Sequence, residues 1–198
     1  ITPTGTSLNT ARIEQAEEEK MELSPAPFEH WTMKEINEQP DAILRTLNNG
    51  ARLADEFNVK LGGLDRNKNV LLRIKHLVIS ACGTSYHAGL YGALAMRALQ
   101  AFDTVQVVDA SELTPHHFTQ EGAGLLVISQ SGETKDTHRA VIMAQEIGVP
   151  TFSIVNAVGS LIARSTKCGV YLNAGREHAV ASTKAFSTQV VALEMIAV

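Results

Sequence analysis

From residue 74 to the end of the chain, short runs rich in β-branched residues alternate with segments of helical length. The predicted strands are residues 74–80, 105–110, 125–129, 151–155 and 170–172. Parallel neighbours in a sheet need a long crossover connection, and a helix is the usual one. The alternation therefore predicts an α/β domain built on a five-stranded parallel sheet, with a last helix that closes the domain.

Two of the predicted helices carry apolar stripes that indicate which face each one buries. Leu90, Leu94 and Ala98 mark the helix after the first strand. The last helix is marked by Phe186, Val190, Leu193 and Ala197. Three-and-four spacing of this kind is typical of a helix packed on a sheet.

The amino-terminal part of the chain differs from the rest in composition. Residues 1–27 are polar, carry a cluster of glutamates and close with Pro25 and Pro27, so we expect a linker or tail that tends to disorder. A helical pattern follows from residue 31 to about 58, interrupted at Pro40. Residues 28–198 are then one domain, and the apolar helical pattern at the end suggests a part of a longer protein.

Composition excludes several classes of function. With 198 residues, a formal net charge of -4 and a pI near 6.0, the chain lacks the basic face of a nucleic-acid-binding protein. Its two cysteines form no metal or disulfide framework, which fits reduced thiols in the cytoplasm. The longest apolar runs are far shorter than the roughly 20 residues that cross a bilayer, so we expect no membrane segment.

Two predicted strand-to-helix turns combine glycine with clustered hydroxyl groups. They span residues 81–85 and 129–134, and in a parallel sheet ligands bind at this edge. A helix N-terminus leaves about four N–H groups unpaired and carries partial positive charge, which suits an anion. Glycine lets the backbone approach, and Ser and Thr donate hydrogen bonds without adding charge. Residues 129–134 are therefore the strongest candidate for a phosphate site.

Helix capping is an alternative explanation for these hydroxyls, because Ser and Thr are common N-caps that need no ligand. For either turn alone both interpretations stay open, although three hydroxyls and an amide in residues 129–134 exceed what one cap uses. A third polar stretch, residues 173–184, reaches the same edge of the sheet. There Ser182 either caps the last helix or touches a ligand, and the residues by themselves favour the cap.

Other kinds of site lack support in the sequence. The turn at residues 81–87 has only one of the glycines of a dinucleotide fingerprint, and no nucleotide P-loop occurs. The seven histidines show no metal-ligand spacing, so we expect neither a metal nor a cofactor. Glu133 and Glu177 could act as general bases, but for Glu133 a simpler role is to complement the dipole of its own helix.

Five segments together resemble the isomerase region of the glutamine:fructose-6-phosphate amidotransferases. The resemblance covers residues 28–198 and is carried by Lys34-Glu35-Ile36 with Glu38-Gln39-Pro40, Cys82-Gly83-Thr84-Ser85-Tyr86, Ser129-Gln130-Ser131-Gly132-Glu133-Thr134, Asn173-Ala174-Gly175, and Val180-Ala181-Ser182-Thr183-Lys184-Ala185-Phe186. The serine-rich turn alone would indicate only the wider sugar-isomerase (SIS) superfamily, a flavodoxin-like three-layer α/β/α fold. The first and last segments narrow it to this family.

The resemblance implies a substrate site and a division of labour. It implies that Ser129, Gln130, Ser131 and Thr134 hold the 6-phosphate of a hexose, and that Thr84, Ser85, Val180 and Ser182 line the sugar. It further implies a homodimeric cytoplasmic enzyme of hexosamine synthesis that makes glucosamine 6-phosphate from fructose 6-phosphate and glutamine without a cofactor. This chain would be the first of two SIS domains. The catalytic residues would lie in the second one, and the glutaminase would be a separate domain.

Some residues depart from the family pattern. Ala179 stands where glycine is common, Arg176 is unusual in its loop, and residues 111–117 replace a more basic stretch. None of these lies in the serine-rich turn. Two alternatives to the enzyme remain open, namely a non-catalytic SIS module that senses sugar phosphates and a structural α/β domain whose hydroxyl turns are only caps.

Overall fold

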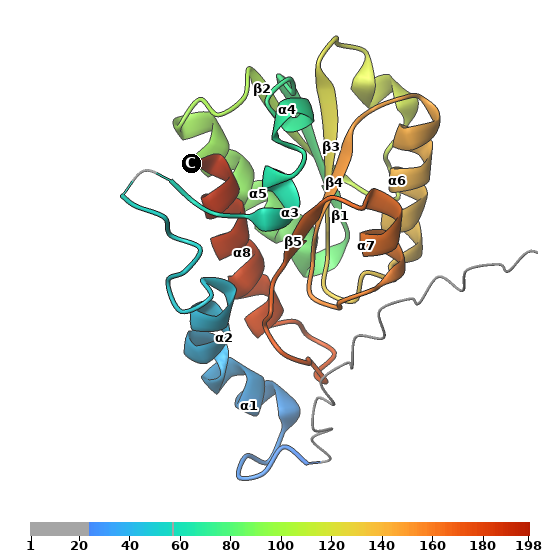
Figure 1. Cartoon of the computed structure of the whole chain (residues 1–198). Helices are drawn as coiled ribbons and strands as arrows, with labels where there is room; N and C mark the ends of the chain where they lie inside the picture. Colours follow the sequence, from blue (N-terminus) through green and yellow to red (C-terminus); the bar gives the residue numbers. More distant parts are fainter. Residues whose placement is uncertain (1–23, 57) are drawn as a thin grey trace, which may run out of the picture.

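The computed structural model describes residues 24–56 and 58–198, which form one α/β domain (Figure 1). Its sheet has five strands in the order β2-β1-β3-β4-β5, and every pair is parallel. The strands are β1 (His76–Ala81), β2 (Thr104–Asp109), β3 (Ala123–Ser129), β4 (Thr151–Val155) and β5 (Gly169–Tyr171). The predicted parallel sheet is confirmed. The predicted tail lies, for residues 1–23, outside the described part of the chain.

Helices cover both faces of the sheet and make the domain three layers thick (Figure 1). They are α1 (Trp31–Asn37), α2 (Gln39–Thr46), α3 (Gly62–Asp65), α4 (Lys68–Leu71), α5 (Gly83–Ala98), the 3-10 helix η1 (Pro115–Phe118), α6 (Lys135–Glu146), α7 (Leu161–Thr166) and α8 (Lys184–Ala197). On one face α5 packs against α8, which in turn packs against α2, while α6 and α7 pack together on the other face. The three-layer α/β/α arrangement is therefore confirmed.

The central strand β3 explains why the sheet needs cover on both sides, since all seven of its residues are buried. Its side chains alternate between two separate hydrophobic clusters. Leu126 and Ile128 face the cluster beneath α5 and α8, whereas Leu125 and Val127 face the cluster beneath α6. A parallel sheet covered by helices on both faces characteristically has such continuous apolar strands.

The face that α5 buries differs from the prediction. Leu90 and Leu94, which the stripe placed inside, are 41% and 62% exposed. The helix instead buries small residues, and Gly92 lies so close to α8 that an added Cβ would be 2.7 Å from the Cβ of Leu193. Close backbone approach therefore decided the buried face, because large side chains would have held the two helices apart. The stripe predicted for α8 is confirmed, with Leu193 and Ala197 buried.

The helical pattern before the sheet is shorter than predicted. The expected interruption is present, since α1 ends at Asn37 and Pro40 lies in the first turn of α2. However, α2 ends at Thr46 rather than near residue 58, because Asn48 and Asn49 adopt positive φ and stop the helix. None of the helices in residues 24–56 and 58–198 has both the length and the apolarity needed to span a membrane.

Candidate functional site

The turns after β1 and β3 meet at the carboxyl edge of the sheet, because these two strands are neighbours. The helix that follows β1 covers one face and the helix that follows β3 covers the other (Figure 1). This reversal is the topological switch point at which open α/β sheets bind their ligands. The two hydroxyl-rich turns of the sequence therefore lie where a ligand site is expected.

Residues 129–134 form a turn that its own hydroxyl groups hold together, and we call it the serine turn. Ser129 Oγ accepts a hydrogen bond from the Gly132 N–H at 3.0 Å and lies 3.1 Å from the hydroxyl oxygen of Thr134. Ser131 Oγ accepts from the Glu133 N–H at 3.2 Å. The turn is thus preorganised by bonds within itself, so a ligand would not have to order it.

The serine turn is also packed tightly against the loop between β4 and α7. Gly132 has a φ of +67°, and a Cβ at this position would lie 2.0 Å from the hydroxyl oxygen of Ser160, whose side chain is buried. The Gln130 carbonyl accepts from the N–H groups of Asn156 and Ala157, both at 3.3 Å. Only glycine fits at position 132 without displacing this loop.

Helix capping does not account for the hydroxyls of the serine turn. Thr134 is the N-cap residue of α6, but its side chain makes no capping bond and contacts Ser129 instead. The carboxylate of Glu133 accepts a hydrogen bond from the Leu161 N–H at 2.8 Å and so caps α7. The Thr134 side chain therefore leaves the first N–H groups of α6 without a capping bond.

The turn after β1 presents Thr84 and Ser85 in the first turn of α5. Ser85 is buried, and its Oγ accepts a hydrogen bond from Gln189 Nε2 at 2.9 Å. A hydroxyl that accepts one hydrogen bond can still donate its proton to another group. Gln189 is itself completely buried on α8. The prediction missed Gln189, although a glutamine on the apolar stripe of that helix was a visible signal.

Cys82 lies beside these hydroxyls at the start of α5. Burial raises the pKa of its thiol, and the nearby charge of Asp109 adds to this, despite an opposing contact with Thr137. The Sγ atom is 3.9 Å from the hydroxyl oxygen of Thr137. Since a thiol must lose its proton to act as a nucleophile, the structure does not favour that role for Cys82.

Residues 173–183 of the third polar stretch form a loop that distant side chains hold at its base, and Lys184 begins α8. Asn156 both accepts from the Ala174 N–H at 2.9 Å and donates to the Gly175 carbonyl at 2.8 Å. Arg45, on α2, donates to the carbonyls of Asn173 and Ala174. These bonds place the following residues at the same edge of the sheet as the two hydroxyl turns.

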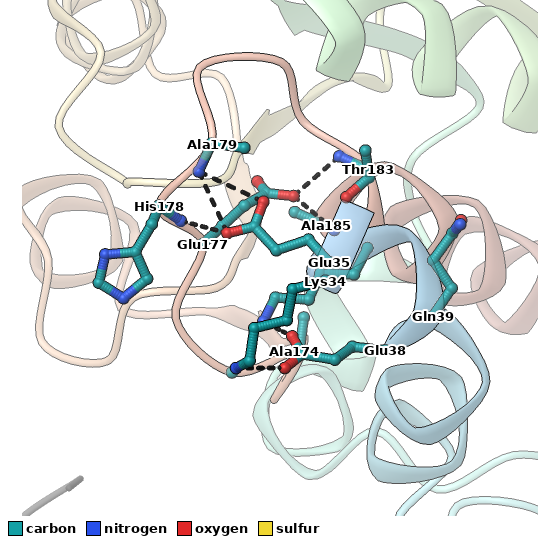
Figure 2. A network of polar contacts seen from close by, with 12 residues as sticks. Lys34, Glu35, Glu38, Gln39, Ala174, Glu177, His178, Ala179, Thr183 and Ala185 are labelled. Atoms are coloured by element: carbon teal, nitrogen blue, oxygen red, sulfur yellow. Dashed lines mark hydrogen bonds and ion pairs between the residues drawn. The ribbon is translucent and has the colours of Figure 1, made fainter. Parts of the chain in front are cut away.

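Two glutamates bind the backbone of this loop, as Figure 2 shows. Glu177 accepts from the Thr183 N–H at 2.8 Å and from the Ala185 N–H at 3.3 Å, so it caps α8. The preference for Ser182 as the cap of this helix is therefore wrong, since Thr183 is the N-cap residue of α8 and the buried Oγ of Ser182 has no hydrogen-bond partner among the described residues. Glu35, from α1, accepts from the N–H groups of His178 and Ala179. The structure thus gives both glutamates structural partners.

The three segments enclose one pocket of about 400 Å³. All eight predicted binding residues line it: Thr84, Ser85, Ser129, Gln130, Ser131, Thr134, Val180 and Ser182. None of its lining residues is Lys, Arg or His, so its polar groups are hydroxyls, an amide, the Cys82 thiol and the backbone. The structure therefore brings the predicted residues together, while their role in binding stays a prediction.

Two further hollows in the described part of the chain lie away from the carboxyl edge of the sheet. These hollows, of about 330 and 370 Å³, lie beside Gly148, Val149 and Pro150 at the amino end of β4. Ligands of parallel sheets bind at the opposite edge. Among the described residues, no group of three or more His, Cys, Asp or Glu side chains is placed to hold a metal ion.

Comparison with known proteins identifies the class. Residues 70–198 match the model of the SIS domain, and the chain belongs to this family. Within it, the chain is similar to glutamine–fructose-6-phosphate aminotransferases: it is 43% identical over 171 residues to the enzyme of Chlorobaculum tepidum and 39% identical over 178 residues to a probable one of Acanthamoeba polyphaga mimivirus. These matches cover 86% and 89% of the chain but only 28% of each relative.

A solved structure supports the same relationship. The C-terminal domain of glucosamine-fructose-6-phosphate aminotransferase from Francisella tularensis superposes with a TM-score of 0.78 at 34% sequence identity. The match covers 89% of this chain and 48% of that one. The chain therefore corresponds to about half of that domain, and to little more than a quarter of the two relatives' length.

Proposed function

We propose that this chain is the sugar-phosphate-binding first SIS domain of an enzyme that converts fructose 6-phosphate and glutamine to glucosamine 6-phosphate and glutamate. This reaction would be the first step of hexosamine synthesis, in a cytoplasmic homodimer. One observation carries the proposal: three segments that are far apart in the sequence bring their hydroxyl and backbone groups to a single pocket at the switch point of the sheet.

The serine turn is the proposed binding site of the phosphate group. Hydroxyls of Ser129, Ser131 and Thr134, the Gln130 side chain and the N-terminus of α6 would replace the water around a doubly charged ester. The anion is held by dipoles rather than by basic side chains, as expected for a chain with a net charge of -4. The sugar would then extend toward Thr84, Ser85 and residues 180–182.

The catalytic groups would come from parts of the enzyme beyond this chain. The proposed reaction needs a general base that moves a proton between C1 and C2 of the sugar, and a source of ammonia. The chain spans only about 28% of the relatives' length, which leaves room for a second SIS domain and a glutaminase domain. We therefore expect this chain alone to bind hexose 6-phosphates weakly and to turn over nothing.

Replacing Ser131 by alanine tests the proposal. The Ser131→Ala variant should lose about tenfold to a hundredfold in affinity for fructose 6-phosphate and glucose 6-phosphate, because a hydrogen bond to a charged group contributes about 1.5–3 kcal/mol. Isothermal titration would measure the loss. Ser111→Ala is the matched control, since this exposed serine follows β2 at the same edge of the sheet but does not line the pocket.

Three results would contradict the proposal in different ways. An unchanged affinity of Ser131→Ala would remove this residue from the site. A parent chain that neither binds hexose phosphates nor gains thermal stability from them would favour a purely structural domain. Formation of glucosamine 6-phosphate by this chain alone, with glutamine or ammonia, would contradict the division of labour between the domains.

A further inference from the structure

Glu35 is a glutamate in an unusual setting, because its residue is only 1% exposed. Its Oε1 accepts hydrogen bonds from the backbone N–H groups of His178 and Ala179, the latter at 3.1 Å, and its Oε2 lies 3.3 Å from the Ala179 nitrogen. A buried carboxylate is costly unless hydrogen bonds compensate it. Charge-assisted bonds of this kind are also stronger than neutral ones, so they fix the backbone that they engage.

The same helix holds the other end of the loop. Glu38, the C-cap residue of α1, forms an ion pair with Lys34 at 2.7 Å (Figure 2). It forms a second ion pair with Lys184 at 2.6 Å. Trp31, at the start of α1, stacks on the His178 ring with a centroid separation of 4.2 Å. Helix α1 thus contacts the chain just before and just after residues 180–182.

Two of the three residues between these anchors have little packing of their own. Val180 is fully exposed and Ala181 is also exposed, yet both line the pocket. A segment without buried contacts takes its position from the residues that flank it. The placement of the sugar-facing backbone therefore depends on the bonds that α1 makes, and Glu35 provides those nearest to Val180.

We propose that Glu35 is a positioning residue that holds residues 178–182 over the sugar part of the pocket. The proposal rests on the proposed function and deepens it by separating two binding contributions. Glu35 contacts the loop, whereas the serine turn is fixed by its own hydroxyls and by residues 156–160. Loss of the Glu35 carboxylate should then weaken binding of the sugar and leave binding of the phosphate group intact.

Two variants of this chain and two probes test the inference. Glu35→Ala should raise the Kd for fructose 6-phosphate by about tenfold or more and change the Kd for inorganic phosphate by less than about twofold. Glu35→Gln keeps an acceptor oxygen without the charge, so it should fall between the parent chain and the alanine variant. Without any ligand, hydrogen exchange of the Ala179 amide should accelerate in the same order. Glu29→Gln, at an exposed glutamate that precedes α1, should change none of these values.

The outcomes separate positioning from a general structural role. If the variants weaken both probes equally, or if loop exchange accelerates while the fructose 6-phosphate affinity stays unchanged, the inference is wrong. Should Glu35→Ala fail to fold, the comparison between Glu35→Gln and Glu29→Gln decides the question alone. A parent chain that binds neither probe would contradict the proposed function, and the exchange data would still show whether Glu35 holds the loop.

Discussion

Replacing Gly132 by alanine should disrupt the serine turn more than its small size suggests. The residue has a φ of +67°, which L side chains rarely adopt, and its new Cβ would lie 2.0 Å from the Oγ and 2.5 Å from the Cβ of Ser160. Ser160 is 5% exposed, and although its Oγ can rotate about the Cα–Cβ bond, its Cβ is fixed to the backbone and cannot move away. The change therefore adds two penalties, one from the backbone conformation and one from overpacking.

The two penalties can be given magnitudes. Left-handed backbone costs an L-residue about 1–2 kcal/mol, partly offset because alanine restricts the unfolded chain by about 0.4–1 kcal/mol. Overpacking of a filled site costs typically about 1–3 kcal/mol more. Gly132→Ala should therefore lower the free energy of unfolding by about 2–4 kcal/mol. It should also weaken phosphate binding, because the N–H of residue 132 bonds to Ser129.

Urea denaturation of matched variants would measure the two penalties separately. Gly148→Ala is the control, since this glycine has a φ of +77° and open space around it, so it should lose only about 1 kcal/mol. Adding Ser160→Gly to Gly132→Ala should recover part of the loss, because it removes both clashing atoms. The reasoning is refuted if Gly132→Ala and Gly148→Ala destabilise the chain equally, or if Ser160→Gly brings no recovery.

Two further predictions concern the packing of the helices. Burial disfavours the charged form of Glu38, but hydrogen bonds and charges of Lys184 and Lys34 outweigh it and hold the pKa of this carboxyl below its ordinary value of 4.5. The stability that Glu38 contributes should be complete above pH 4.5 and vanish as the pH falls through the lowered pKa. The free energies of unfolding that urea titrations give for Glu38→Gln and the parent chain should therefore converge in acid. Gly92→Ala should lower the free energy of unfolding by about 1–3 kcal/mol, because the new methyl group would clash with Leu193. Leu94→Ala, on the exposed face of α5, should change it by less than about 0.5 kcal/mol. Equal losses of the two variants in thermal melts would contradict this account of α5.

The local pattern of the sequence predicted the sheet because each strand of a parallel sheet carries its own signal. A run such as Leu125 to Ser129 is apolar throughout since both of its faces are covered, and this holds for any arrangement of the covering helices. The hydroxyl turns were equally visible, because strand order does not change which end of a parallel strand bears its turn. The two turns line the same pocket because β1 and β3 are neighbours in the sheet.

Contacts between distant segments were beyond the reach of local patterns. The face that α5 buries depends on how closely α8 approaches at Gly92, and the stripe of leucines gave the opposite answer. Ser182 had the right residue type for a cap, but Thr183 is the N-cap residue of α8, and Glu177 accepts from the N–H groups of Thr183 and Ala185. For α5 a helix from another part of the chain decided the buried face, whereas for α8 a carboxylate within the preceding loop took the capping role.

By itself, the sequence determined the class of fold, the order of strands and helices along the chain, and the groups able to bind an anion, because these depend on periodicity and residue chemistry over short stretches. Only the tertiary structure decided which buried polar groups hold the anion-binding groups in position. Glu35 is tied to His178 over 143 positions, and Gln189 to Ser85 over 104. Such pairs leave no periodic trace in the sequence, since the partner that satisfies a buried polar group is chosen by packing in space.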